Sequence, residues 1–272
     1  WSARARMKAA NSDIVITSHT MLQVHGEFIQ QGVDGGLLGE FHHIIVDEAH
    51  SLERIVVDGS TLEVAPWELF QKINTITKGV ERAGKYGNEN AQLDKRTRDS
   101  ITIIQDIFSH QVGRDLDMKE WGRQSIGLKQ IWISGASASH AMALDAYENT
   151  LPPMLEDVWK GYTQLADDLS REVANMTTGR GKVNKAIAAC RYLSRLFWLV
   201  GQSVTTRDGT CEGYGTTFAV FADGYVGRDM NGRDKQDIRL RAVPLDVSQF
   251  LKRNLWSKAR STTMISATLR DY

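Results

Sequence analysis

Residues 41–50 read Phe-His-His-Ile-Ile-Val-Asp-Glu-Ala-His, an apolar run that ends in two adjacent acids. The β-branched run predicts a buried strand. In open α/β sheets, an acid at the carboxyl end of a strand faces the crevice where ligands bind. Asp47 suits a magnesium ligand there, and Glu48 suits a base that orients and deprotonates water. We favour this interpretation over a helix-capping Asp followed by a solvated Glu.

A second short polar segment, Ser266-Ala267-Thr268-Leu269, follows another apolar strand, Thr262 to Ile265. Small hydroxylated residues at a strand end can hydrogen-bond a neighbouring acid and relay its state to another domain. The alternative is a Ser/Thr turn that happens to end a strand. Because the acid pair lies upstream, we favour the functional interpretation of Ser266 and Thr268.

The pattern around these motifs indicates an α/β fold. Residues 3–11 have helical composition, and Ile14-Val15-Ile16-Thr17 predicts another buried strand before a helix that starts near Ser18. Continuous apolar strands separated by helices are typical of a parallel sheet buried on both faces. The strands return after Gly213, with runs at 216–221 and 238–243.

The middle of the chain is predicted to be helical. Pro66 opens one helix, Ile101 to Phe108 mark another, and Pro152-Pro153 open the clearest one. A loop at 176–181 separates that helix from the next, so the two form an αα-hairpin. Between 113 and 135 the pattern predicts no clear element, and 134–139 predicts a turn. The whole insertion spans about 150 residues.

These motifs resemble motifs II and III of superfamily-two helicases, specifically the DinG/XPD branch of 5′-to-3′ DNA helicases. Residues 12–22, Ser-Asp-Ile-Val-Ile-Thr-Ser-His-Thr-Met-Leu, are similar to the stretch that precedes the DEAH box in that branch, with Ser18 where Asn is usual. Pro244-Leu245-Asp246-Val247 is similar to the segment that precedes its SATL motif. The resemblance covers about 1–55 and 214–272, and a long helical "arch" between the two motifs is a trait of the branch.

The resemblance implies a partial RecA-like P-loop NTPase sheet with a large, mostly helical arch insertion. It assigns 1–55 to motor domain 1 with the DEAH box, 56–212 to the arch, and 213–272 to the rest of motor domain 1. Asp47 is expected to bind Mg²⁺, Glu48 to activate water, and His50 to couple the nucleotide site to Ser266 and Thr268. ATP and Mg²⁺ are the implied cofactors, single-stranded DNA and duplex DNA the partners. His19 lies where the branch has a His, near the DNA path or motor cleft.

Several parts of the family pattern are missing from the sequence. No Gly-x-x-x-x-Gly-Lys-Thr/Ser phosphate loop occurs, because Gly179-Arg180-Gly181-Lys182 has Met176 and Val183 at the decisive positions. We therefore expect a fragment that is inactive alone. An iron–sulfur cluster is possible in the parent protein but not within this segment, since the only cysteines, Cys190 and Cys211, suit buried packing positions.

A basic stretch follows the hairpin loop. Arg180, Lys182 and Lys185 begin the second hairpin helix, whereas the preceding helix is rich in acids. The basic residues either contact the phosphates of a single strand or pair with the acidic helix. We take them as candidate DNA-binding residues.

Composition limits the remaining possibilities. Hydrophobic residues make up 42% and charged residues 24%, with 33 basic and 33 acidic side chains, so binding of polyanions by bulk charge is excluded. No apolar run is long enough to span a membrane, and we expect a cytoplasmic location, nucleoid-associated in a bacterium. The alternatives to a general helicase are a DinG-like subunit recruited to a type IV CRISPR ribonucleoprotein and a non-motor nucleic-acid-binding relative.

Overall fold

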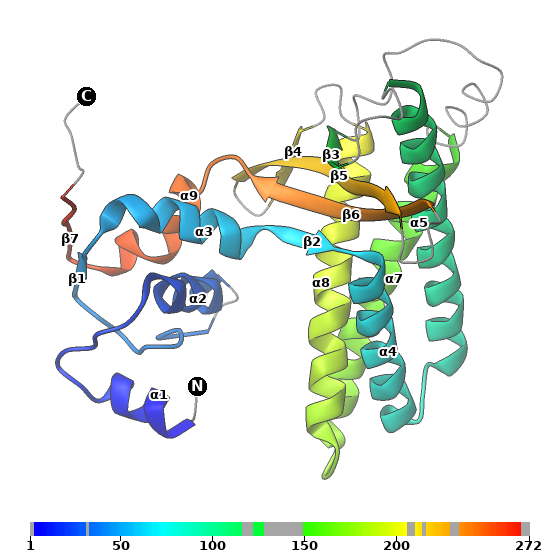
Figure 1. The fold of residues 1–272 in the computed structure, drawn as a ribbon. Coiled ribbons are helices and arrows are strands. Elements are labelled where there is room, and N and C mark those ends of the chain that lie inside the picture. Colours follow the sequence, from blue (N-terminus) through cyan, green and yellow to red (C-terminus); the bar gives the residue numbers. More distant parts are fainter. Residues whose placement is uncertain are drawn as a thin grey trace. The chain divides into compact units, whose positions relative to one another are not determined.

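The computed structural model describes residues 3–30, 33–115, 122–127, 149–205, 210–213, 216–228 and 234–267. The chain divides into two compact units (Figure 1). The first, here called the α/β unit, comprises 1–61, 212–218 and 243–272. The second, the helical unit, comprises 62–211 and 219–242. Each unit is described separately.

The α/β unit is organised around two parallel strands from opposite ends of the chain. Strand β1 (His43–Val46) pairs with β7 (Ser261–Met264), in a register that places Ile44 beside Thr262 and Val46 beside Met264. The predicted parallel sheet is therefore present as this small strand pair, within a mixed α/β fold. The other elements are α1 (Ala3–Ala10), α2 (His19–Gln30), the 3₁₀ turn η1 (Ala49–Ser51), α3 (Leu52–Ser60), α9 (Ser248–Asn254) and the 3₁₀ turn η4 (Trp256–Lys258).

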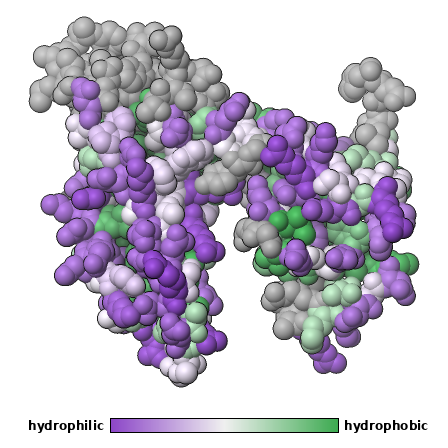
Figure 2. Space-filling model, turned by 180° about the vertical axis from the view of Figure 1, so that it is seen from behind, coloured by the Kyte–Doolittle hydropathy of each residue, from purple (hydrophilic) through white to green (hydrophobic). Residues whose placement is uncertain are grey.

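One face of strand β1 is buried and the other is not, while no residue of β7 is buried. Ile44 and Val46 point into a core that they share with residues from α2, α3 and α9, namely Leu22, Leu52, Val56, Val247 and Leu255. Ile45, between them, is 71% exposed. Burial on both faces, expected from the apolar run, is therefore wrong for the described residues. Figure 2 shows hydrophobic surface on the α/β unit, while the helical unit is mostly hydrophilic in that view.

The predicted strand at Ile14–Thr17 does not form. The segment has no regular structure, and Ile14 and Ile16 are 81% and 94% exposed. An apolar run becomes a buried strand only where a neighbouring strand and a covering helix are present. In the described part of the chain the parallel sheet consists of β1 and β7 alone, and neither pairs with this segment.

In the described residues of the helical unit there are four long helices, matching the predicted helical middle of the chain (Figure 1). They are α4 (Pro66–Ala83), α5 (Gly87–Asp115), α7 (Leu151–Asn175) and α8 (Arg180–Thr205). Helices α7 and α8 form the predicted αα-hairpin, and their apolar stripes are buried, including Leu155, Tyr162, Leu193 and Phe197. The hairpin loop ends at Gly179, whose φ of 78° favours glycine. The predicted turn at 134–139 lies outside the described residues.

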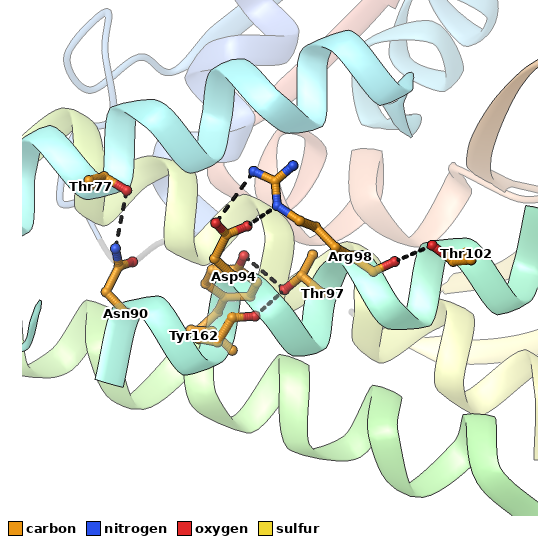
Figure 3. A network of polar contacts seen from close by, with 8 residues as sticks. Thr77, Asn90, Asp94, Thr97, Arg98, Thr102 and Tyr162 are labelled. Atoms are coloured by element: carbon orange, nitrogen blue, oxygen red, sulfur yellow. Dashed lines mark hydrogen bonds and ion pairs between the residues drawn. The ribbon is translucent and has the colours of Figure 1, made fainter. Parts of the chain in front are cut away.

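Polar contacts connect α5 to both of its neighbours (Figure 3). Asn90 donates to Thr77 of α4 at 3.1 Å. Thr97 and the buried Tyr162 of α7 share a hydroxyl hydrogen bond of 3.0 Å. Burial raises the pKa of Tyr162, so this hydroxyl stays protonated. Buried polar groups are costly without partners, so these bonds hold α5 in place against α4 and α7.

A small antiparallel sheet belongs to the helical unit. Its strand order is β2 (Leu62–Val64), β6 (Asp234–Pro244), β5 (Thr216–Arg228) and β3 (Gly122–Gly127), and β4 (Thr210–Gly213) pairs with β5. Because β6 pairs with β2 and β5 with β3, residues 219–242 group with the helices. The expected third segment, 213–272, is thus divided between the two units, and α3 falls in the α/β unit. Among the described helices, none has the length and apolar character needed to cross a bilayer.

Candidate functional site

The carboxyl edge of the β1–β7 pair gathers most of the predicted site residues. The amide of Ile265 donates to the Val46 carbonyl at 2.8 Å, and the amide of Ala49 donates to the Ile265 carbonyl at 3.0 Å. These two bonds extend the pairing beyond the strand ends. As a result Asp47, Glu48 and Ser266 leave the sheet at the same edge, as the parallel arrangement predicts.

The backbone of Glu48 has an unusual conformation. Its φ of 50° and ψ of 46° lie in the left-handed region, which non-glycine residues rarely occupy. Three hydrogen bonds hold it there. The Glu48 amide donates to Asp47 Oδ1 at 3.0 Å, and the Glu48 carbonyl accepts from the amide and the hydroxyl of Ser51 at 3.0 and 2.9 Å. Such strain, supported by its surroundings, is typical of functional sites.

His50 connects the two predicted motifs. Its Nδ1 lies 2.8 Å from Ser266 Oγ and 3.3 Å from Glu48 Oε2. With a proton on Nδ1 the imidazole can donate to the carboxylate, and without it the Ser266 hydroxyl can donate to the ring. The side chains of His50 and Glu48 are half exposed, so the contact is open to a ligand. Thr268 lies outside the described residues.

His19 joins the same cluster through Ser51, which no sequence motif marks. Ser51 Oγ lies 3.1 Å from His19 Nδ1. Because the Ser51 hydroxyl donates its only hydrogen to the Glu48 carbonyl, the His19 ring must carry the proton on Nδ1 and donate to Ser51. Ser51 comes 32 residues after His19, and no local pattern signals that pairing.

The carboxylates of Asp47 and Glu48 are both exposed and carry oxygen ligands of the kind Mg²⁺ prefers. Asp47 Oδ1 accepts from the Glu48 amide, and no group among the described residues bonds Oδ2. Mg²⁺ usually takes one or two carboxylates and completes its shell with water and phosphate oxygens. No cluster of three or more potential metal-ligating side chains occurs in the described ranges.

The three basic candidates belong to the helical unit. Arg180 donates to the Met176 carbonyl of the hairpin loop, and Lys182 and Lys185 are exposed on α8. Four of the five acids of α7 pair with residues other than these: Glu156 with Lys160, Asp157 with Arg96, Asp168 with Arg171, and Glu172 with Lys85. Within the described residues, no ion pair joins α7 to the basic start of α8.

Cys190 and Cys211 are buried free thiols, as predicted for packing residues. Burial raises the pKa of Cys190 to about 12 and that of Cys211 to about 11. Both therefore remain protonated near neutral pH, whereas a thiolate is the reactive and metal-binding form.

Compared with known proteins, the chain matches no family model and no curated sequence.

Proposed function

We propose that this chain is part of an ATP-dependent DNA helicase of the DinG/XPD type, which moves 5′ to 3′ along single-stranded DNA and unwinds duplex. One observation carries the proposal. Asp47, Glu48, His50 and Ser266 form one cluster at the carboxyl edge of a parallel strand pair, although His50 and Ser266 are 216 residues apart. The two sequence motifs independently predicted that His50 and Ser266 act together.

In the proposed mechanism each residue has a separate task. Asp47 would hold Mg²⁺ together with water, and the ion would supply positive charge for the phosphates. Glu48 orients the attacking water and accepts its proton. The constrained backbone at Glu48 sets the direction in which its side chain leaves the main chain. His50 changes its partner between Glu48 and Ser266 as the charge at the nucleotide changes. Ser266 passes that change to the segment after β7.

A phosphate-binding loop is also needed, because phosphoryl transfer depends mainly on positioning and electrostatics. Residues 1–272 contain no Gly-x-x-x-x-Gly-Lys-Thr/Ser sequence. We assign that loop to a segment outside these residues. The exposed apolar face around Ile45 supports the same view, since a strand of this composition is normally covered on both faces.

The test is ATP hydrolysis, measured on residues 1–272 and on a longer protein that includes a phosphate loop. Residues 1–272 should show only background turnover. The longer protein should hydrolyse ATP, and Glu48→Gln should abolish hydrolysis and unwinding while ATP binding persists, because the substitution removes the base and keeps the shape. Glu53→Gln, at an exposed acid of α3, is the matched control. Full unwinding by Glu48→Gln would refute the motor assignment.

A further inference from the structure

A groove on the helical unit has features that the motor assignment does not use. It lies between α4 and α8, beside β2, and encloses about 660 Å³, within the size range of ligand sites. Trp67, Gln71, Lys72 and Thr75 line it from α4. Lys185 and Tyr192 line it from α8, and Glu63 closes the end at β2.

Tyr192, one of the lining residues, is held by contacts at its hydroxyl and at its ring. The Tyr192 hydroxyl donates to the Glu63 carbonyl at 2.5 Å and accepts from the Glu63 amide at 2.8 Å. The ammonium of Lys72 lies 3.9 Å from the centre of the Tyr192 ring, a cation–π contact. Burial lowers the pKa of Lys72, although Glu68 opposes this, so the groove keeps this amine partly desolvated. These contacts hold the Tyr192 ring and the Lys72 ammonium together as one pair of side chains in the groove lining.

The charges of the groove are unevenly satisfied. Glu63 is paired with Arg239 and Arg241, both at 3.2 Å, and the Glu68 carboxylate interacts electrostatically with Lys72. Lys185 is exposed, and no carboxylate of the described residues pairs with it. Among the charged lining residues, Lys185 is therefore the one without a counter-ion in the described part of the chain, which favours an anionic group beside it.

Trp67 supplies the other recognition element. Its side chain is 56% exposed at the start of α4, beside the groove. An exposed indole next to lysines is the combination with which proteins bind single-stranded nucleic acids, because bases stack on the ring while the amines contact phosphates. Gln71 and Thr75 add polar groups along the same wall.

We propose that the α4–α8 groove is a binding site for nucleotides of a single strand, with a base stacked on Trp67 and phosphates at Lys185 and Lys72. The site deepens the proposed function, on which it rests, by naming a contact for the translocating strand within the helical unit. An acidic peptide is the competing occupant, because it could use the same lysines but has no base to stack.

The experiment measures binding of a dye-labelled oligothymidylate by fluorescence anisotropy at several salt concentrations. Trp67→Ala should weaken binding about 10-fold, as expected when one base stack is removed, and Trp67→Phe should restore most of the affinity. Phe70→Ala is the matched control, since Phe70 is 53% exposed on the same helix and does not line the groove. Lys185→Ala should lower the log–log salt slope by about 0.7, and Lys95→Ala, on α5, should not.

An abasic strand of equal length separates stacking from charge. Wild type should bind it more weakly than oligothymidylate, and Trp67→Ala should then weaken binding no further. Equal effects of Trp67→Ala and Phe70→Ala, or the same effect of Trp67→Ala on the abasic strand, would overturn the proposal. So would an oligoglutamate that binds as tightly as the strand and depends equally on Trp67. Glu48 does not line the groove, so Glu48→Gln should bind the strand like wild type. The groove proposal and the motor proposal can therefore fail separately.

Discussion

The imidazole of His50 lies 2.8 Å from the hydroxyl of Ser266, across two segments that the whole helical unit separates in sequence. This contact is possible because β1 and β7 are paired in parallel and end at the same edge. It places a titratable ring between an acid, Glu48, and the first residue after β7 that carries a hydroxyl.

If His50 and Ser266 act as one unit, their effects should not add. We predict that His50→Ala and Ser266→Ala each reduce DNA-stimulated ATP hydrolysis in a protein that includes a phosphate loop, and that the double variant is little slower than either. Contacting residues typically show coupling of about 0.5–3 kcal/mol. The control is Ser261→Ala, which removes a similar contact of 2.7 Å to His43 on the same strand pair. Additive effects in the double variant would separate the two residues.

Asp47→Asn should act on metal binding, and not on the base. The amide keeps the hydrogen bond to the Glu48 amide through its oxygen but loses the charge that attracts Mg²⁺. Removing a residue that only hydrogen-bonds a metal ligand already costs roughly 10-fold in metal affinity. We therefore expect Asp47→Asn to weaken Mg²⁺-dependent nucleotide binding by at least that factor. Calorimetric titration with and without Mg²⁺ measures this, and an unchanged Mg²⁺ dependence would remove Asp47 from the metal site.

His25 should make the stability of the protein fall in mild acid. Its Nδ1 accepts from the amides of Leu37 and Leu38, both at 3.1 Å, and burial lowers its pKa from 6.5. Stability from this group is fully present above pH 6.5. It declines as the pH falls below that value, because the unfolded chain then binds a proton that the folded chain resists.

The resulting slope is at most about 1.4 kcal/mol per pH unit. His25→Asn keeps a side-chain acceptor and cannot titrate, so denaturant unfolding at pH 7 and at lower pH should show a smaller difference than in wild type. His42→Asn, at an exposed histidine, is the control. An imidazole of His25 that titrates at or above 6.5 in the folded protein, measured by NMR, would contradict the prediction.

Helices α4 and α8 approach closely at Gly79. A Cβ at this position would lie 2.2 Å from Cβ of Ala186, so Gly79→Ala should force the helices apart and destabilise the fold by about 1–3 kcal/mol. Gly87→Ala places its Cβ in open space and should be neutral or slightly stabilising. Chemical denaturation compares the two. Equal stabilities would mean that the helices shift at no cost.

The helices could be predicted from the sequence because their signals are local. Pro66 starts α4, and the apolar stripe of α7 and α8 is visible at helical spacing. Burial of strands depends on partners elsewhere in the chain, which explains why Ile14 and Ile16 were expected inside and are exposed. The site followed from two motifs at strand ends. Contacts such as His19 to Ser51 or Tyr192 to Glu63 join residues whose spacing carries no pattern, and the groove beside Tyr192 could not be foreseen.

The basic start of α8 provides the last prediction. If Arg180, Lys182 and Lys185 stabilised the fold by pairing with α7, their neutralisation would lower the melting temperature slightly, since exposed pairs contribute roughly 0–1 kcal/mol. Four of the five acids of α7 are instead paired with Lys160, Arg96, Arg171 and Lys85.

We therefore expect the triple alanine variant to keep its melting temperature and to bind single strands with a flatter salt dependence, by about 0.7 in log–log slope for each phosphate that the variant no longer neutralises. Lys185 lines the groove, so Lys185→Ala alone should lower the salt slope by one such amount. Arg180→Ala and Lys182→Ala should each lower the slope independently. An unchanged slope together with a lowered melting temperature would assign the basic stretch to structural support.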